Sequence, residues 1–260
     1  MEIIEYTCVG KRGQEILCED GIFISSRYIA VIDGVTDKTG CQIHGFSPGV
    51  FAKKALLQAL YTMPSCNALQ CAAYLQNALA CACTQEELQN AKPQAVCILY
   101  SVEHQEIWAM GDCLCQIDGK NFSFTKVIDD VFAQIRADVL WHYLYIGKQN
   151  LQHVDIGRER ILPLLCLQHK LANQNTQLSY TVLNGMDNIK PTVIPVQKGQ
   201  SIVLASDGYP KLFGSLAQSE DYLQKVLQTD PLCMYSNLQC KALNPNWQSF
   251  DDRSYIRFIA

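Results

Sequence analysis

The order of strand-like and helical segments is the feature of this sequence that most restricts its fold. Short runs rich in β-branched and aromatic residues occur in groups, and longer stretches with apolar residues at helical spacing separate those groups. A regular alternation of strand and helix, which indicates a parallel sheet, does not occur. The sequence therefore predicts an α+β protein with antiparallel sheets and with helices packed outside them.

The strand-like runs fall into three groups. The first is a hairpin with strands at 21–25 and 28–32, preceded by a weakly alternating run at 2–9. Polar turns separate four further runs, which predict an antiparallel meander: 95–102, 106–110, 113–117 and 121–125. The remaining strand-like runs are 179–183, 192–196, 201–205 and 253–259.

Helical spacing predicts helices over 48–63, 67–88, 219–227 and 232–243. The stretch 129–175 is also helical in composition, and Pro163 predicts a kink or a boundary within it. The sequence shows no internal repeat, linker or low-complexity segment. We therefore expect one domain over 1–260.

Composition excludes several classes of protein. A chain of 260 residues that is 48% hydrophobic can bury a large core, since roughly three-quarters of the unfolded surface disappears at this size. The net charge of -4, without a basic stripe, argues against a nucleic-acid partner. No apolar run approaches the ~20 residues that span a bilayer, and the amino terminus lacks the features of a signal peptide. We expect a cytoplasmic monomer that binds neither nucleic acid nor membrane.

The thirteen cysteines are expected to be reduced and mostly buried, because their number is odd and their spacing is scattered. The pairs Cys81 and Cys83, and Cys113 and Cys115, lack the spacing of zinc ligands. None of the thiols is flanked by a histidine or a basic cluster, so we expect none to be catalytic.

Two apolar strands run directly into the dipeptide Asp-Gly, at Asp33-Gly34 and at Asp207-Gly208. One Asp-Gly can simply be a turn, but its repetition weakens that interpretation. A third acidic pair, Asp251-Asp252, precedes the last strand, where a solvated turn is the alternative. Carboxylates gathered from distant segments repel one another unless divalent cations lie between them, and oxygen ligands suit Mg²⁺ or Mn²⁺.

Five short motifs, in the correct order over nearly the whole chain, resemble those of the type 2C metal-dependent Ser/Thr protein phosphatases, the PPM family. They are Glu19-Asp20, the strand ending in Asp33-Gly34, the segment 108–112 with Gly111-Asp112, the segment 202–208 with Asp207-Gly208, and the segment 251–254. The resemblance implies a four-layer αββα sandwich, in which helices flank two antiparallel sheets and the metal site lies at one end. It also implies a flap within 129–175.

The resemblance assigns the metal site residue by residue. Asp33 bridges two Mn²⁺ or Mg²⁺ ions, the carbonyl of Gly34 binds one of them, and Asp207 with Asp251 holds the other. Glu19 and Asp20 support metal-bound water. Asp112 is either structural or a ligand of a third ion.

A basic residue that holds phosphate is expected upstream of Glu19. Arg12 is the nearest candidate, and Lys11 competes with it. Alternatively, both residues only solvate a turn between Gly10 and Gly13.

The chain also departs from the family pattern. Val35-Thr36-Asp37 follows the first Asp-Gly where the family usually has a His-Gly-Gly run, and Val35 cannot protonate a leaving group. Cys113-Leu114 stands where the family has Ser-Arg after its central Gly-Asp. The chain thus resembles a divergent, bacterial-like member.

The resemblance implies a hydrolase that removes phosphate from phosphoserine and phosphothreonine in proteins with a two-metal-activated water. The substitutions around Val35 and Cys113 motivate the alternative, a catalytically inactive phosphatase-like binding or regulatory module.

Overall fold

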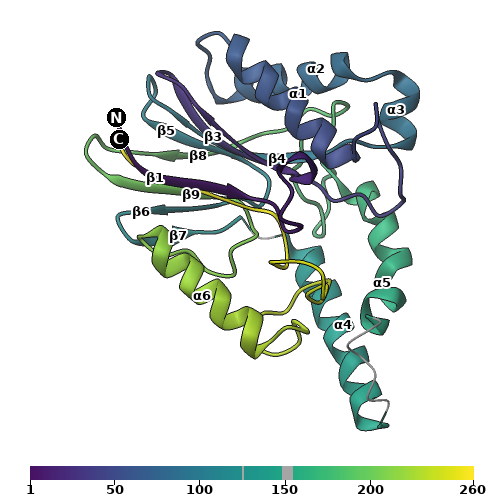
Figure 1. Ribbon diagram of the computed structural model, residues 1–260. Helices are drawn as coiled ribbons and strands as arrows, with labels where there is room; N and C mark the ends of the chain where they lie inside the picture. Colours follow the sequence, from purple (N-terminus) through teal and green to yellow (C-terminus); the bar gives the residue numbers. More distant parts are fainter. Residues whose placement is uncertain (125, 148–154) are drawn as a thin grey trace.

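Two five-stranded antiparallel sheets, stacked face to face, form the centre of the computed structural model, which describes residues 1–124, 126–147 and 155–260 (Figure 1). The first sheet has the order β1 (Glu2–Val9), β10 (Arg253–Ile259), β9 (Ser201–Ala205), β6 (Leu114–Ile117), β7 (Lys120–Phe122). The second has the order β2 (Asp20–Ile24), β3 (Tyr28–Gly34), β4 (Ala95–Ser101), β5 (Glu106–Met110), β8 (Thr192–Pro195).

Strand β3 shows how the sequence builds two apolar layers from one strand. Because successive side chains point to opposite faces, Ile29 and Val31 join the core between the sheets. Ala30 and Ile32 face the other way and pack beneath helices. All four side chains are fully buried, which explains why this strand is a continuous apolar run.

Helices α1 (Pro48–Thr62) and α2 (Ala68–Ala82) cover the outer face of the second sheet (Figure 1). The Ser47 hydroxyl accepts the N–H of Val50 at the start of α1, and a capping box begins α2. Helix α6 (Leu216–Thr229) lies on the outer face of the first sheet, where Arg253 of β10 pairs with Glu220. The expected order of helix, sheet, sheet and helix is confirmed.

Helices α4 (Val127–Tyr145) and α5 (Ile156–Leu167) pack on each other and extend away from one end of the sandwich (Figure 1). Pro163 lies inside α5 and so is not a helix boundary. The flap expected within 129–175 would consist of these helices. Residues 148–154 of that stretch lie outside the described residues, and its role as a flap stays a prediction.

The four strands expected as one meander divide between the two sheets, so that prediction is wrong. Strands β4 and β5 belong to the second sheet, whereas β6 and β7 belong to the first. The chain crosses over at Gly111, whose φ of 116° is rare for any other residue. A Cβ there would lie 2.2 Å from Cγ1 of Val96. The end of the fourth expected strand, Thr125, lies outside the described residues.

The helix expected over 232–243 is also absent from the structure, which has turns and bends there. The Asp230 carboxylate accepts backbone N–H groups from four residues of this segment: Met234, Tyr235, Ser236 and Asn237. The buried Arg136 of α4 donates to the carbonyls of Cys233 and Gln239. These bonds satisfy backbone groups that a helix would have paired internally.

Two smaller differences complete the comparison. The helical stretch expected over 67–88 is divided, because Thr84 caps a separate helix α3 (Gln85–Asn90). The segment 179–183 forms only isolated bridges, from Tyr180 to Ala172 and from Leu183 to Ala95. Short 3-10 helices lie at η1 (Glu15–Leu17) and η2 (Gln168–Leu171). Within the described ranges, no helix has both the length and the apolar composition to cross a membrane.

Candidate active site

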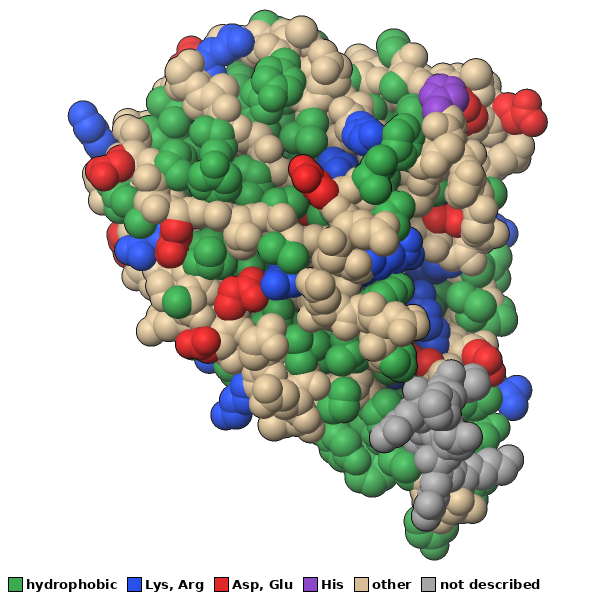
Figure 2. Space-filling view, in the orientation of Figure 1, with side chains coloured by type: hydrophobic (Ala, Val, Ile, Leu, Met, Phe, Trp, Pro, Cys, Tyr) green, Lys and Arg blue, Asp and Glu red, His purple; other side chains and the backbone are tan. Residues whose placement is uncertain are grey.

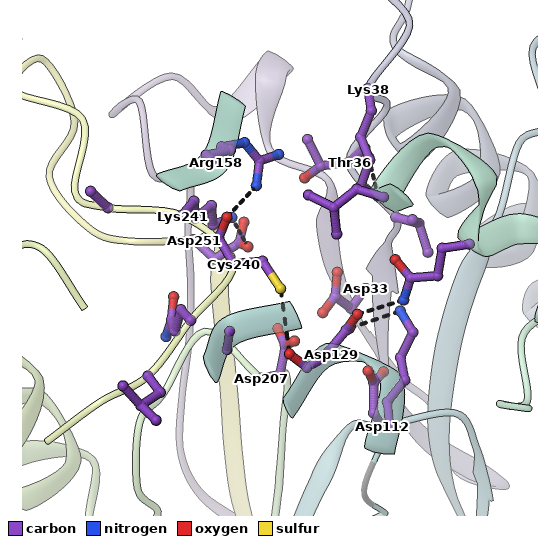
Figure 3. Close-up of a pocket in the computed structure, with 18 of the residues that line it drawn as sticks. Asp33, Thr36, Lys38, Asp112, Asp129, Arg158, Asp207, Cys240, Lys241 and Asp251 are labelled. Atoms are coloured by element: carbon purple, nitrogen blue, oxygen red, sulfur yellow. Dashed lines mark hydrogen bonds and ion pairs between the residues drawn. The ribbon is translucent and has the colours of Figure 1, made fainter. Parts of the chain in front are cut away.

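Seven aspartates line one pocket of about 500 Å³ at an end of the sandwich, and four of them stand at or near strand ends of the two sheets (Figure 3). Asp33 lies near the end of β3, Asp207 follows β9, Asp251 precedes β10, and Asp112 lies between β5 and β6. Strands β9 and β10 are antiparallel neighbours, so the end of one lies beside the start of the other. The structure therefore brings together Asp33, Asp207 and Asp251, which the sequence picked out.

The pKa values of three of these carboxyl groups are raised. Loss of hydration is the largest cause of the raised pKa of Asp33, followed by the negative charges of Asp20 and Asp207. Asp207 faces the open pocket, yet lost hydration and the charges of Asp112 and Asp251 raise its pKa to about 7. Lost hydration also raises the pKa of Asp112. A bound cation would relieve this mutual repulsion.

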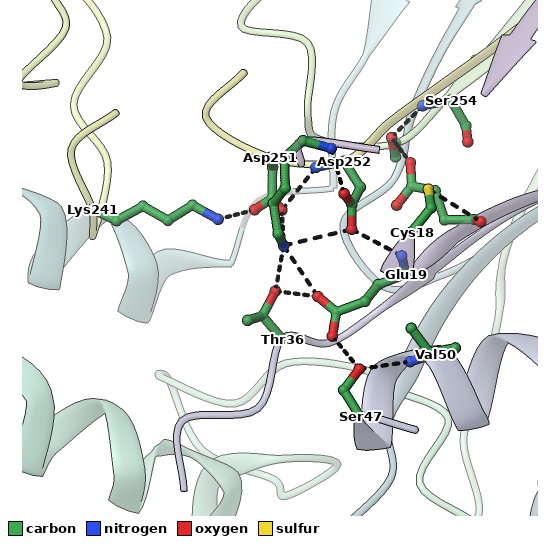
Figure 4. Close-up of polar contacts among 12 residues, drawn as sticks. Cys18, Glu19, Thr36, Ser47, Val50, Lys241, Asp251, Asp252 and Ser254 are labelled. Atoms are coloured by element: carbon green, nitrogen blue, oxygen red, sulfur yellow. Dashed lines mark hydrogen bonds and ion pairs between the residues drawn. The ribbon is translucent and has the colours of Figure 1, made fainter. Parts of the chain in front are cut away.

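Asp251 is the exception, because two lysines hold it as an anion. Burial alone would raise the pKa of Asp251, but the ammonium groups of Lys241 and Lys11 outweigh burial and keep the pKa below its usual range. Nζ of Lys11 lies 2.8 Å from Oδ1 of Asp251, and Lys241 contacts the other oxygen, Oδ2 (Figure 4).

Lys11 is the centre of a buried polar cluster beside the pocket. Its ammonium donates to Glu19 Oε2 at 3.1 Å and to Thr36 Oγ1 at 3.0 Å, in addition to Asp251. Its backbone N–H donates to Asp252 Oδ1 at 2.7 Å. Only 1% of Lys11 is exposed. Burial favours a lower pKa for Lys11, but the neighbouring carboxylates, Asp251 first, raise it above its usual range.

Glu19 and Asp20 are both buried, and neither lines the pocket. Glu19 uses both oxygens within the protein, accepting from Ser47 at Oε1 and from Thr36 and Lys11 at Oε2 (Figure 4). Asp20 accepts from Ser206 at Oδ2, whereas its buried Oδ1 has no hydrogen-bond partner in the described part of the chain. Their support of metal-bound water stays a prediction.

Gly34 lines the pocket next to Asp33 and must be a glycine, since a Cβ there would lie 2.2 Å from the carbonyl oxygen of Gly49. Its assignment as a carbonyl ligand stays a prediction.

The carboxylates fit a hard divalent cation by their chemistry. Asp33 and Asp207 have raised pKa values, and Asp20, whose buried Oδ1 has no partner among the described residues, is opposite Asp33 in the register of β2 and β3. Over residues 1–124, 126–147 and 155–260, however, no three or more His, Cys, Asp or Glu side chains are grouped so as to hold a metal ion. The ammonium groups of Lys11 and Lys241 contact the two oxygens of Asp251.

Arg12 is exposed, with its guanidinium 5.4 Å from the centre of the Trp247 ring. It is not among the pocket-lining residues, although Trp247 is. The Gly13 N–H donates to the Gly10 carbonyl, so Lys11 and Arg12 both stand in a turn. The alternative, that both only solvate this turn, is wrong for Lys11, which is buried. Of the two basic residues, only Lys11 contacts the carboxylates.

Arg12 lies against Trp247 of the pocket wall, so Arg12→Ala is expected to raise KM for a phosphopeptide several-fold. Little change in kcat is expected, because a guanidinium pairs with phosphate but cannot ligate a cation. Steady-state kinetics with saturating Mn²⁺ would measure this. A variant with unchanged KM would contradict the assignment of phosphate binding to Arg12.

The cysteines are all free thiols, and Cys240 lines the main pocket. Burial raises the pKa of Cys240 to about 11, so its thiolate is scarce at neutral pH. We expect mild alkylation near pH 7 to leave hydrolysis unchanged, as measured by turnover before and after iodoacetamide treatment. A Cys240→Ser variant is the control for steric blockage. Loss of turnover in both proteins, with the fold retained, would indicate a cysteine nucleophile.

The sequence did not identify the basic residues that share the pocket with the aspartates. Lys38, Lys126, Arg158 and Lys241 all line it. Lys241 belongs to the segment expected as a helix, and the others stand in loops or helices without a motif. No local signal marks them.

No family model and no curated protein sequence matches this chain. Solved structures that are similar over nearly its whole length are PPM-type Ser/Thr phosphatases, the family that the motifs resemble. One is the catalytic domain of the phosphatase PstP in complex with two manganese ions, with 17% identity, a TM-score of 0.49, and coverage of 99% of this chain and 98% of the other.

The Mycobacterium tuberculosis phosphatase PstP/Ppp has 18% identity, a TM-score of 0.49, and coverage of 98% and 97%. The PPM Ser-Thr phosphatase MsPP from Mycobacterium smegmatis, in complex with cacodylate, has 14% identity, a TM-score of 0.46, and coverage of 99% and 98%. These TM-scores lie below 0.5 and these identities below 25%, so the activity of this chain is inferred from its own residues.

Proposed function

We propose that this protein is a metal-dependent phosphomonoester hydrolase that removes phosphate from phosphoserine and phosphothreonine in proteins. The observation that carries the proposal is the convergence of Asp33, Asp207 and Asp251 in one pocket. Two of these carboxyl groups have raised pKa values, which is typical of functional carboxylates.

Asp33, Asp207 and Asp251 would hold two Mn²⁺ or Mg²⁺ ions, with Asp112 available for a third. The chemistry that such ions supply is activation of a water molecule and neutralisation of charge on the phosphoryl oxygens. Phosphate-monoester hydrolysis is among the slowest uncatalysed reactions, so charge neutralisation and positioning must supply most of the acceleration.

The pocket's own residues hold the substrate in this proposal. Lys126 lies at the pocket wall, where its ion pair with Asp129 at 2.9 Å fixes the position of its ammonium group. Val35 also lines the pocket but has no proton to donate. Protonation of the leaving alkoxide therefore falls to water or to another group.

A second candidate function is a catalytically inactive binding or regulatory module. The observation that favours it is the pairing of Asp251 with both Lys11 and Lys241, because these ammonium groups already supply positive charge at that carboxylate.

Hydrolysis of para-nitrophenyl phosphate and of a serine-phosphorylated peptide, each with Mn²⁺ and with EDTA, separates the two candidates. Mn²⁺-dependent release of phosphate supports the hydrolase. Binding of the phosphopeptide without any turnover supports the inactive module.

A further inference from the structure

Two of the four cations that line the pocket, Lys38 and Arg158, form no ion pair with any described residue. Lys38 follows β3, and Arg158 lies in the first turn of α5. Figure 3 shows both side chains on the same side of the pocket, beyond Asp33 and Asp207. Figure 2 shows Lys and Arg side chains gathered on this face of the molecule.

The other two cations of the pocket already have anionic partners. Lys126 pairs with Asp129, and Lys241 pairs with Asp251. In the part of the chain that the structure describes, Lys38 and Arg158 have no carboxylate partner. Nζ of Lys38 donates to the Thr36 carbonyl at 3.5 Å, and Nη1 of Arg158 donates to the Cys240 carbonyl at 2.8 Å.

The charge of Arg158 is one of several that act on Lys38. The pKa of Lys38 is lowered, first by lost hydration, then by the charge of Lys126, with Arg158 and Lys241 adding to the effect. Among the causes, only Asp129 opposes the shift. Although seven aspartates also line the pocket, it thus holds two cations without an ion-pair partner among the described residues. An anion between them would remove the repulsion and gain charge-assisted hydrogen bonds.

We propose that Lys38 and Arg158 form an anion subsite that takes a second anionic group of the substrate, beside the phosphate to be removed. The second group is a phosphate or a carboxylate on a neighbouring residue of the phosphopeptide, because both offer the oxygen pair that a guanidinium recognises. The substrate preference rests on the proposed function, whereas the anion binding does not.

Direct binding tests the subsite without any turnover. In EDTA, calorimetry with inorganic pyrophosphate should show binding to the wild type, weakened about tenfold by Lys38→Met and by Arg158→Gln. The glutamine keeps a donor for the Cys240 carbonyl. Lys198→Met is the matched control, since Lys198 is exposed just before β9, at the other end of that strand from Asp207. No binding to the wild type, or equal binding to all variants, would overturn the subsite.

Kinetics with Mn²⁺ then identify the second group. Three phosphoserine peptides are compared, with alanine, glutamate or a second phosphoserine as the neighbour. We expect kcat/KM about tenfold higher for an anionic neighbour, and the variants should lose that preference while Lys198→Met keeps it. The anionic peptide with the higher kcat/KM shows whether the second group is a carboxylate or a phosphate.

Two outcomes keep the tests separate. Equal losses for all peptides and for para-nitrophenyl phosphate would mean that Lys38 and Arg158 bind the scissile phosphate, which contradicts a second subsite. Absence of turnover by the wild type would overturn the proposed function and leave the pyrophosphate result to decide the subsite. Circular dichroism checks the fold of each variant, and Lys38→Met decides alone if Arg158→Gln does not fold.

Discussion

Asp207→Asn is expected to lower Mn²⁺-dependent hydrolysis to less than about 1% of wild type. Mutation of a residue that only orients a metal ligand already costs about 10- to 100-fold in metal affinity or activity, and loss of a ligand should cost more. The amide keeps the shape of the side chain but removes its charge. The amide therefore attracts a divalent cation less strongly than the carboxylate and offsets less of the cation's dehydration. Asparagine is as suitable as aspartate before a glycine in a turn, so the fold should remain intact. Turnover of a phosphopeptide and Mn²⁺ calorimetry measure the two effects.

Asp118→Asn provides a matched control. Asp118 also precedes a glycine, but it lies in the turn between β6 and β7 and accepts the N–H of Ser201, at the start of β9. Its φ of 47° is one that asparagine tolerates. This variant should retain full activity. An Asp207→Asn protein that binds two Mn²⁺ ions and is as active as the Asp118→Asn control would contradict the proposed metal site.

Lys11→Met should destabilise the fold by about 3–5 kcal/mol, which is typical when one partner of a buried charge cluster is removed. The methionine fills most of the volume, but Glu19 and Asp252, which are 5% and 3% exposed, lose their cation. Urea unfolding in EDTA, followed by circular dichroism, gives the free energy of unfolding.

Two comparisons make this measurement specific. Lys241→Met should have a smaller effect, because Lys241 is partly exposed and contacts only Asp251 among the carboxylates. Adding Asp251→Asn to Lys11→Met should recover part of the loss, since it removes one of the carboxylates left without a partner. If Lys11→Met lowered the free energy of unfolding by less than about 1 kcal/mol, water or a rearrangement would have to compensate the carboxylates that lose Lys11.

The sequence predicted most of the sandwich because its strands carry local signals. An apolar run such as 28–32 that ends in Asp-Gly is recognisable without knowledge of its neighbours. The wrongly predicted helix over 232–243 shows the limit. Its apolar spacing is helical, but Asp230 and Arg136 bind its backbone groups instead. Arg136 is 97 residues from Cys233, and a local pattern cannot show a bond of that separation.

The candidate site was predictable to a similar extent. Asp33, Asp207 and Asp251 stand at the ends of predicted strands, and the pairing of antiparallel strands brings such ends close together. The choice between Lys11 and Arg12 could not be made, because both cations lie over the Trp247 ring and only contacts with distant segments bury one of them. Lys11 is buried among carboxylates, whereas Arg12 is exposed. Nothing in the sequence around Lys38 or Arg158 marks them as pocket residues, because they meet only through the tertiary fold.

The contact between Lys11 and Asp252 also has a consequence for folding. Its partners are 241 residues apart, and they lie at the junction where β1 pairs with β10. Contacts of such long sequence separation form slowly. On the ribosome, the pocket cannot assemble until β10 has been synthesised, so earlier nascent chains should have no ligand-binding activity. Any ligand of the pocket would then bind only chains in which β10 has paired with β1, and it would protect these chains against unfolding.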